Sequence, residues 1–426
     1  MNSVSVAPCR LEGCVSMPPS KSASHRAVIC AALASGKSTL RPVALSDDIA
    51  ATISCMRELG ADITVNGDTV TVDGTALHDS LHNKKITLDC GESGSTLRFL
   101  IPVAAALGAD ARFIGHGRLP QRPIGVFSDC LPEKGVSFSA KGGLPLDISG
   151  RLQSGIYRVP GNISSQFITG LLLALPLLEG DSEIILTSEL QSAGYIDMTT
   201  DIMRVFGVSV CRTSEGWKIK GGQSYCARSY EIEGDWSQAA FFMTAAALGG
   251  CITIDNLDVS SCQGDKACME IYSRFGASVT ENPSGSITVS GGSLHGIDID
   301  AENIPDMVPA LAVTAALCEG VTRITGAERL RIKECDRLAA MADALTRLGA
   351  DIRETPDGLI IKGVKTLHGG SVEGCNDHRI VMSMTAASCR CDGSIVISDM
   401  ESINKSYPSF FEDIEKLGGK YNVIMG

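Results

Sequence analysis

The residues best suited to chemistry in this sequence are basic and hydroxyl side chains at the starts of apolar helices. The first example is the segment 17–36, where two prolines and a polar turn precede a run of small and apolar residues. Lys21 and Arg26 fall at the start of this predicted helix, where a positive charge opposes the helix dipole. Backbone N–H groups, serine hydroxyls and cations together bind anions at such a position. The segment therefore predicts an anion site, although the two cations could instead be solvated or ion-paired.

Similar groups recur at later helix starts and in the segments that connect the helices. One such group could belong to an ordinary polar surface, but recurrence at corresponding positions favours a shared ligand site. The later helix starts carry Ser93, Gly94, Ser95, Arg98, Ser164, Ser165, Gln166, Asp306, His378 and Arg379. The connecting segments add Arg122, Ser192, Lys333, Glu334, Arg337 and Lys405.

The elements that carry these groups form six copies of one unit. Each copy begins with a polar turn and an apolar helix that ends at a glycine, and the copies are spaced by about 70 residues. A strand, an amphipathic second helix and a β-hairpin follow, with glycine in turns such as Asn66-Gly67 and Asp357-Gly358. The six apolar helices lie in the segments 17–36, 91–108, 164–180, 234–250, 304–320 and 376–393.

Helices that are apolar on all sides need cover on all sides. We therefore expect an α/β fold in which three units wrap their sheets around three buried helices, so that six units make two pseudo-threefold domains. Residues 4–15 read as one strand outside the first unit, which makes the first domain discontinuous. The expected domains are 1–18 with 228–426, and 19–227. If the helix starts of each domain emerge on one face, two facing domains enclose a cleft, where we expect the active site.

The composition argues against several classes of protein. The chain has 426 residues, of which 44% are hydrophobic and 20% charged, as is typical of a well-cored globular protein. The formal net charge of −12 and the aromatic share of 5% argue against binding to nucleic acid or to an anionic membrane. The 16 cysteines show no Cys-x-x-Cys spacing, and neither a signal segment nor a membrane-length apolar run is evident. We therefore expect a cytoplasmic protein.

Seven motifs in order resemble those of the 5-enolpyruvylshikimate-3-phosphate synthase family: PSKSASHR, GESGSTLR, LPQRPIG, SSQF, IPD, RIKECDR and NDHR. The resemblance covers essentially the whole chain. It implies two domains of three βαβαββ units each, with the active site between them. It also implies transfer of the enolpyruvyl group of phosphoenolpyruvate to the 5-hydroxyl of shikimate 3-phosphate, through a tetrahedral intermediate and with release of phosphate. This step of aromatic amino-acid biosynthesis, in the shikimate pathway, is expected to need neither a cofactor nor a metal.

The resemblance assigns roles to the residues at matching positions. Asp306 resembles the base for the 5-hydroxyl and Glu334 the acid for the vinyl carbon, with Lys21 able to take part in both steps. Lys333 and Arg337 favour the ionised form of Glu334, so burial or substrate charge must oppose them. The residues expected to bind shikimate 3-phosphate are Lys21, Ser22, Arg26, Ser164, Ser165, Gln166, Ser192, Asp306 and Lys333. Those expected to bind phosphoenolpyruvate are Lys21, Gly94, Arg122, Gln166, Arg337, Arg379 and Lys405.

Three positions depart from the pattern of the family. Glu92 stands where asparagine is common, in the turn nearest to phosphoenolpyruvate. Phe99 stands where proline is common, and Arg329 where some members have asparagine. An acid that faces a trianionic ligand repels it unless the acid turns away or pairs with a cation. These departures bear on the affinity for phosphoenolpyruvate and for inhibitors that mimic it, such as glyphosate.

The sequence also contains parts of three other kinds of site: a phosphate-binding loop, a metal site and a cysteine nucleophile. The Gly-Lys-Ser segment 36–38 resembles the end of a phosphate-binding loop, but Ala31 occupies the place of the first glycine. His25 and His378 lack partners at metal-ligand spacing. Cys335 has no evident histidine partner, and we interpret it as a spectator rather than a nucleophile.

Two other functions remain open. A UDP-N-acetylglucosamine enolpyruvyl transferase has this fold, but that family carries a reactive cysteine beside its Arg-Pro motif, and the loop 119–125 has no cysteine. A non-catalytic anion-binding protein of this fold would not need Asp306 and Glu334. We expect a monomer whose partners are the two small-molecule substrates.

Overall fold

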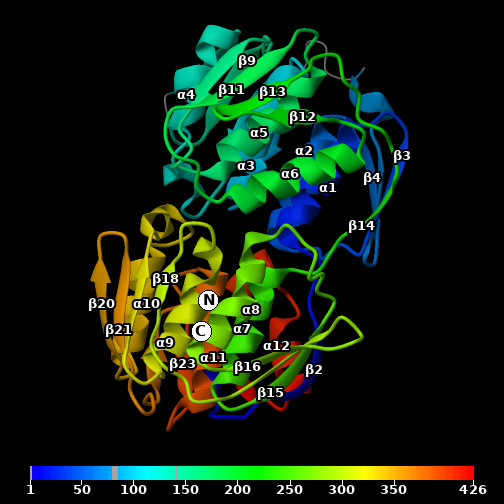
Figure 1. Cartoon of the computed structure of the whole chain (residues 1–426). Helices are drawn as coiled ribbons and strands as arrows, with labels where there is room; N and C mark the ends of the chain where they lie inside the picture. Colours follow the sequence, from blue (N-terminus) through cyan, green and yellow to red (C-terminus); the bar gives the residue numbers. More distant parts are fainter. Residues whose placement is uncertain (1, 79–84, 141) are drawn as a thin grey trace. The chain divides into compact units, whose positions relative to one another are not determined.

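The computed structural model describes residues 2–78, 85–140 and 142–426. The chain divides into two compact units (Figure 1). One unit, called the terminal unit, consists of Met1–Pro18 and Glu233–Gly426, and the other, called the middle unit, is Pro19–Ile232. Within the described residues, each unit contains three four-stranded sheets.

The three sheets of the middle unit have the same strand order. In each sheet, one parallel pair is extended by an antiparallel hairpin. The first sheet has the order β14(Ser229–Glu231), β3(Lys37–Arg41), β5(Thr69–Asp73) and β4(Asp62–Asn66). The second has the order β6(Lys85–Asp89), β7(Asp110–Ile114), β9(Leu146–Gly150) and β8(Val136–Phe138). The third has the order β10(Ile156–Val159), β11(Ser182–Leu186), β13(Gly216–Ile219) and β12(Val210–Arg212).

The terminal unit follows the same order in two of its sheets. These are β2(Glu12–Ser16), β15(Cys251–Asp255), β17(Ile287–Ser290) and β16(Ser278–Glu281), and then β18(Asp298–Asp300), β19(Val321–Thr325), β21(Gly358–Lys362) and β20(Asp351–Thr355). The third sheet has the order β22(Gly370–Val372), β23(Ile395–Ile397), β1(Ser3–Val6) and β24(Tyr421–Ile424). The N-terminal strand β1 therefore takes the place that a hairpin strand has in the other sheets.

The expectation of a single strand over residues 4–15 was wrong. The structure has two strands there, β1 and β2, and they belong to different sheets. Pro8 lies between them. Proline lacks the N–H that a ladder needs, so the chain can leave one sheet here and enter the next.

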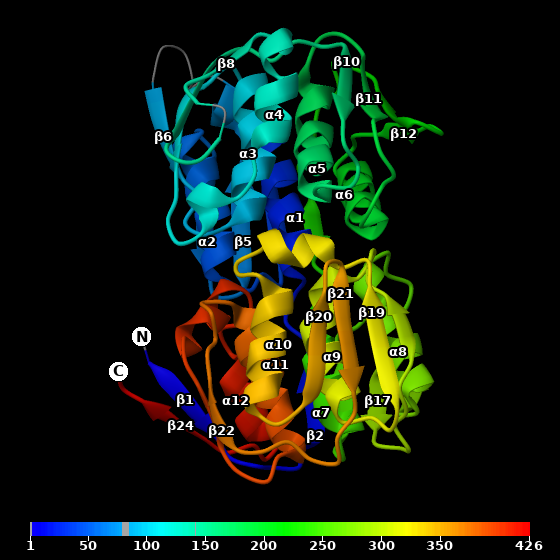
Figure 2. The ribbon, with the colours of Figure 1, turned by 90° about the vertical axis from the view of Figure 1, so that its left-hand side faces the viewer.

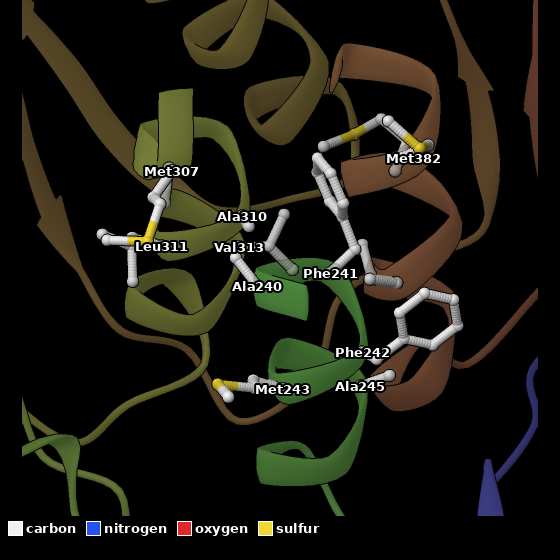
Figure 3. Close-up of a cluster of buried hydrophobic side chains, with 14 of the residues drawn as sticks. Ala240, Phe241, Phe242, Met243, Ala245, Met307, Ala310, Leu311, Val313 and Met382 are labelled. Carbon is white, nitrogen blue, oxygen red and sulfur yellow. The ribbon is translucent and has the colours of Figure 1, made fainter. Parts of the chain in front are cut away.

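Three helices in each unit are buried on nearly all sides. In the middle unit they are α1(Lys21–Leu33), α3(Gly94–Ala106) and α5(Ser165–Ala174), and in the terminal unit α7(Trp236–Ala247), α9(Val308–Ala316) and α11(His378–Ala387). Small residues let these helices approach closely: a Cβ on Gly170 of α5 would lie 2.4 Å from the carbonyl oxygen of Arg98 in α3. In the terminal unit, Phe241, Val313 and Met382 bring the three helices into one apolar core (Figure 3).

The remaining helices carry polar residues on one side. The longer ones are α2(Asp47–Glu58), α6(Ala193–Val205), α8(Cys268–Phe275) and α10(Arg337–Arg347), and the short ones α4(Gly125–Cys130) and α12(Phe410–Lys416). In the terminal unit, α10 packs beside β20 and β21 (Figure 2). In the part of the chain that the structure describes, no helix is long and apolar enough to cross a membrane.

Candidate active site

The start of α1 carries an ion pair. Ser20 caps the helix by accepting a hydrogen bond from the backbone N–H of Ala23. The Nζ of Lys21 lies 2.9 Å from Oδ2 of Asp48, which belongs to the first turn of α2. The alternative of an ion-paired cation therefore holds for Lys21, and an anionic ligand at this position meets a lysine that Asp48 already orients.

Arg26 is buried rather than solvated, with only 3% of its surface exposed. Its Nε donates to Oγ1 of Thr199 at 2.7 Å, and its Nη1 donates to the carbonyl oxygen of Ser22 at 2.6 Å. The guanidinium also lies over the ring of Phe99, 5.1 Å from the centroid. The phenylalanine that replaces the common proline therefore supports a predicted site residue.

The turn before α3 is shaped around the guanidinium of Arg122. An ideal Cβ on Gly94, the first residue of α3, would lie 2.6–2.7 Å from Cζ, Nη1 and Nη2 of that guanidinium. Arg122 itself follows the short 3-10 helix η2(Leu119–Gln121) and is 7% exposed. Because only glycine leaves this space, Arg122 can lie directly on the helix start, where the backbone N–H groups also point.

Gln166 is held in one orientation by two partners. Its Oε1 accepts from Nη1 of Arg98 at 2.6 Å, and its Nε2 donates to Oγ of Ser95 at 2.9 Å. Arg98 is fixed in turn by the carbonyl oxygen of Pro123, which accepts from both its Nε and its Nη2. These hydrogen bonds place Gln166, at the start of α5, next to the start of α3.

Three of the predicted serines of the middle unit, Ser164, Ser165 and Ser192, lie at the starts of two helices that pack together, α5 and α6. Ser164 caps α5 by accepting from the backbone N–H of Gln166, and Ser165 is the first residue of that helix. Ser192 precedes α6 with a left-handed backbone, at φ 56°, and is 2% exposed. Hydroxyls and backbone N–H groups of this kind suit a phosphate.

In the terminal unit, Asp306 lies among three cations. Its Oδ1 is 3.1 Å from Nη1 of Arg337 and 3.5 Å from Nζ of Lys333, and its Oδ2 is 3.1 Å from Nη2 of Arg379. Asp306 belongs to the 3-10 helix η6(Pro305–Met307) that leads into α9. The structure thus brings four predicted residues from three separate segments into direct contact.

Arg337 links Asp306 to two further acids. It is 2% exposed, and its Nη2 lies 2.8 Å from Oε2 of Glu334. Its Nε donates to Oδ2 of Asp377 at 2.7 Å, and Asp377 also caps α11 by accepting from the backbone N–H of Arg379. A fully buried guanidinium among three carboxylates is fixed in position and in charge.

These contacts shift two pKa values in opposite directions. Burial alone would raise the pKa of Asp306, but Arg379, Lys333 and Arg337 outweigh burial and hold that pKa well below 3.8. Burial would lower the pKa of Arg337, but Asp377, Glu334 and Asp306 outweigh it and hold that pKa well above its ordinary value. In the absence of ligand, Asp306 is therefore a carboxylate and Arg337 a cation at neutral pH.

Lys405 contacts the turn that precedes α11. It ends the 3-10 helix η9(Met400–Lys405) and is 7% exposed. Its Nζ donates to the carbonyl oxygen of Asn376 at 2.6 Å, in the turn that precedes α11. The turn 375–377 therefore positions Lys405 through a backbone carbonyl and Arg337 through a side chain.

Glu92 and Arg329, the other two positions that depart from the family pattern, also have defined contacts. The carboxylate of Glu92 rests against Gly117, where a Cβ would lie 2.4 Å from Oε2, and it lies 4.0 Å from Nε2 of His116. Arg329, which is 8% exposed, donates from Nη2 to the carbonyl oxygen of Glu302 at 2.5 Å.

His25 and His378 are both buried. Burial, followed by the charges of Lys21 and Arg26, holds the pKa of His25 well below 6.5, so its imidazole is neutral. Among residues 2–78, 85–140 and 142–426, no group of three potential ligands is arranged to hold a metal.

Several residues that position the site were missed in the sequence. Asp48, Thr199 and Asp377 hold Lys21, Arg26 and Arg337. Asp377 lies inside the NDHR motif, residues 376–379, but no role was assigned to it, and its place before a helix is typical of an ordinary cap. A buried arginine needs a carboxylate partner, and this need could have pointed to Asp377. The local sequence does not show that Arg337 is buried.

The comparisons with known proteins agree on one family. The family model of EPSP synthase (3-phosphoshikimate 1-carboxyvinyltransferase) matches residues 6–414. A 3-phosphoshikimate 1-carboxyvinyltransferase of Clostridium perfringens is 49% identical over 422 residues, which are 98% of this chain and 99% of that protein. The enzyme of the same name from Clostridioides difficile is 46% identical over 430 residues, covering 99% of this chain and 98% of that one.

Solved structures extend the likeness to the fold. The EPSP synthase of Acinetobacter baumannii superposes with a TM-score of 0.83 at 29% identity, with full coverage of both chains. The enolpyruvyl transferase NikO of Streptomyces tendae reaches a TM-score of 0.80 at 19% identity, covering 100% of this chain and 99% of that one, which shows a shared fold. The chain therefore belongs to the EPSP synthase family.

Proposed function

We propose that the protein transfers the enolpyruvyl group of phosphoenolpyruvate to the 5-hydroxyl of shikimate 3-phosphate and releases phosphate, as a 3-phosphoshikimate 1-carboxyvinyltransferase of the shikimate pathway. The observation that carries this proposal is that Asp306 and Glu334 share one buried guanidinium, that of Arg337. Acids held among cations suit a reaction that moves protons between anionic substrates. A binding protein would not need these acids, and the loop 119–125 lacks the cysteine of the UDP-sugar enzyme.

The middle unit supplies most of the residues proposed for shikimate 3-phosphate. The start of α5 with Ser164 and Ser165, together with Ser192, offers hydroxyl and backbone donors to the phosphate. Arg26 is proposed to bind the carboxylate. The remaining contacts are assigned to Lys21, Ser22, Gln166, Asp306 and Lys333.

Phosphoenolpyruvate is assigned to arginines and lysines of both units. Arg122 lies on the start of α3 beside Gly94, and Arg337 and Arg379 converge on Asp306. Their planar guanidinium groups can each hold a carboxylate or phosphate through two hydrogen bonds. Lys21, Gln166 and Lys405 complete the set. Because this set is divided between the two units, the expected cleft between domains stays a prediction.

In the proposed first step, the 5-hydroxyl oxygen bonds to C2 of phosphoenolpyruvate. Asp306 takes the hydroxyl proton and Glu334 gives a proton to C3, while Lys21 assists. The tetrahedral intermediate then loses a proton from C3 and releases phosphate. No bond to the protein forms at either step.

The low pKa of Asp306 makes it a weak base before the substrates bind. Anionic groups on Arg337, Arg379 and Lys333 neutralise the charges that depress this pKa. Substrate binding therefore raises the basicity of Asp306 at the moment when a base is needed.

The test is the release of phosphate from phosphoenolpyruvate. Wild type should release phosphate with shikimate 3-phosphate and not with UDP-N-acetylglucosamine. Asp413→Asn is the matched control for variants of Asp306 and Glu334, because Asp413 is also buried but is bound to Tyr407 and Lys416. Release with the UDP-sugar alone, or with neither acceptor, would overturn the proposal.

The cellular setting of the protein is tested separately. We propose a cytoplasmic monomer that needs no cofactor or metal and binds no nucleic acid, which the net charge of −12 supports. Light scattering after gel filtration should give the mass of one chain. Phosphate release should persist after treatment with a chelator.

A further inference from the structure

A chain of short hydrogen bonds joins the helices α1, α2 and α3 of the middle unit. Nδ1 of His25 in α1 lies 2.7 Å from Oγ1 of Thr52 in α2, which lies 2.6 Å from Oγ1 of Thr96 in α3. Oγ1 of Thr96 in turn lies 2.8 Å from Oγ of Ser93, the cap of α3. All four side chains are buried. The chain therefore ends one residue before Gly94, at the start of α3.

The direction of these hydrogen bonds follows from a count of hydrogens. In the contact between Thr96 and Ser93, Oγ1 of Thr96 is the donor. A hydroxyl carries one hydrogen, so the hydrogen in the 2.6 Å contact between the two threonines must come from Thr52. Thr52 then has no hydrogen left for His25 and accepts from Nδ1 of the imidazole. His25 is therefore the tautomer with its proton on Nδ1.

The surroundings of the imidazole agree with this tautomer. Among the described residues, the buried Nε2 of His25 has no hydrogen-bond partner. The ring of Phe99 meets the imidazole edge-on, with 6.2 Å between the ring centroids, and supplies no acceptor. Because the imidazole is neutral, only one of its nitrogens carries a proton. With that proton on Nδ1, no N–H of the ring lacks an acceptor.

Thr96 fixes the cap of α3 through two contacts. Oγ of Ser93 accepts from the backbone N–H of Thr96 at 3.2 Å and from its hydroxyl at 2.8 Å. The guanidinium of Arg122 lies against the next residue, Gly94, where a Cβ would be 2.6 Å from Cζ of the arginine. A change in the cap therefore moves both the surface beside Arg122 and the backbone N–H groups that can bind an anion.

The two threonines also contact the residue that orients Lys21. Oγ1 of Thr52 and Oγ1 of Thr96 each lie 3.4 Å from the carbonyl oxygen of Asp48. The carboxylate of Asp48 lies 2.9 Å from Nζ of Lys21. These longer contacts share the hydrogens that already serve the short chain, so they hold Asp48 more weakly than the chain holds Ser93.

We propose that Thr96 is a positioning residue for the binding of phosphoenolpyruvate, and that Thr52 and the Nδ1–H tautomer of His25 orient its hydroxyl. The inference rests on the proposed function for the identity of the ligand, but not for the tautomer. Thr96 acts through Ser93 and the start of α3 rather than by contact with the substrate. This helix start is proposed to hold the anion throughout the reaction. A disturbed start therefore weakens binding of the substrate and of the transition state alike, which raises KM and spares kcat.

The first test compares variants that remove or keep the hydroxyl. Thr96→Val removes it at nearly the same size, and the loss of one buried hydrogen bond predicts a rise in KM for phosphoenolpyruvate of about three- to tenfold, with kcat near that of wild type. Thr96→Ser keeps the hydroxyl and should restore KM. Thr52→Val should raise KM in the same direction, because Thr96 then loses the donor that orients it. This second variant carries the test if Thr96→Val does not fold.

Thr244→Val is the matched control. Thr244 is a fully buried threonine near the end of α7 in the terminal unit, and its Oγ1 lies 2.6 Å from the hydroxyl of Tyr272. Thr96→Val and Thr244→Val should both unfold at a lower denaturant concentration than wild type, but only Thr96→Val should raise KM. The proposal is overturned if KM is unchanged in Thr96→Val or in Thr52→Val, or if Thr96→Ser or Thr244→Val raises it as much as Thr96→Val does.

The tautomer is tested without substrate. Two-dimensional 1H–15N spectra of protein labelled with 15N-histidine distinguish a protonated ring nitrogen from a bare one, and the signals that vanish in His25→Gln belong to His25. We expect a protonated Nδ1 and a bare Nε2. A proton on Nε2 would reverse the chain and overturn the proposed orientation of Thr96. If no phosphate is released by wild type, the proposed function fails, whereas this spectrum still decides whether the hydrogen-bond chain has the inferred direction.

Discussion

Replacement of Asp306 by asparagine separates proton transfer from substrate binding. The amide keeps the shape of the side chain but removes a negative charge that lies within 3.5 Å of Lys333, Arg337 and Arg379. A positioned base contributes about 10²–10⁴-fold to the rate. This range corresponds to about 2.7–5.4 kcal/mol of activation free energy. We therefore expect kcat to fall within that range.

Substrate affinity should change in the opposite direction. With the carboxylate gone, the three cations no longer have it as a partner and attract anions more strongly. The dissociation constants of phosphoenolpyruvate and shikimate 3-phosphate should hold or improve in Asp306→Asn. The unliganded protein should lose up to about 3–5 kcal/mol of unfolding free energy, because a buried ion pair is broken. Bound substrate should restore part of that loss.

Acid titration gives an independent readout of the same residue. The pKa of Asp306 lies below its ordinary value of 3.8, so the ionised form stabilises the fold above about pH 4. This stabilisation is lost as the pH falls through the lowered pKa. The unfolding free energy of Asp306→Asn should therefore depend less on pH than that of wild type below about pH 4.

The assays are single-turnover chemistry at saturating substrate, titration calorimetry and denaturant unfolding. Asp413→Asn is the control, since it removes a buried acid that is bound to Tyr407 and Lys416 outside the proposed site. It should lower stability and leave kcat near that of wild type. If Asp306→Asn binds its substrates more weakly while its single-turnover rate stays near normal, the residue only orients Lys333 and the arginines, and its assignment as the base is wrong.

Four further predictions concern the neighbouring residues. Glu334→Gln should lower kcat by about 10²–10⁴-fold without weakening binding in calorimetry; loss of affinity with normal single-turnover chemistry would contradict its role as the acid. Arg122→Ala should raise KM for phosphoenolpyruvate in steady-state assays more than it lowers kcat, and an unchanged KM would place Arg122 outside that site. Cys335→Ser should keep most of its activity, and a loss in kcat of more than about a hundredfold with the fold intact would make this thiol a nucleophile. Glyphosate should compete with phosphoenolpyruvate for the guanidinium of Arg122 that lies beside Gly94, so inhibition that excess phosphoenolpyruvate does not relieve would remove the turn 92–94 from the site.

Much of the fold could be predicted because each repeat carries its own local signals. Runs of alanine, valine and leucine closed by glycine predict buried helices, and the structure buries every residue from Ala23 to Leu33. The division of residues 4–15 into β1 and β2 could not be predicted in this way. Their neighbours, β23, β24 and β15, come from segments hundreds of residues away, and local pattern does not show which strand pairs with which.

The candidate site was predictable to a similar depth. Cations at a helix start oppose the helix dipole, and for this reason the sequence predicts Lys21 and Arg26 as site residues. Their partners do not stand out. Asp48 and Asp377 look like ordinary residues at helix starts, and only the folded chain brings them to Lys21 and Arg337. From the sequence, Arg337 is placed in a connecting segment, whereas the structure makes it the first residue of α10 and buries it with three acids.

The placement of β1 has a consequence for how the protein is made on the ribosome. β1 pairs with β24, so Ser3 lies opposite Ile424, and translation must pass residue 424 before this ladder can close. At about 5–20 residues per second, on the order of 20–80 s separate the synthesis of the two strands. The middle unit is complete long before that. Residues 3–6 therefore wait with both edges open while the chain grows, and this interval is when a chaperone, or a strand of another nascent chain, competes for them.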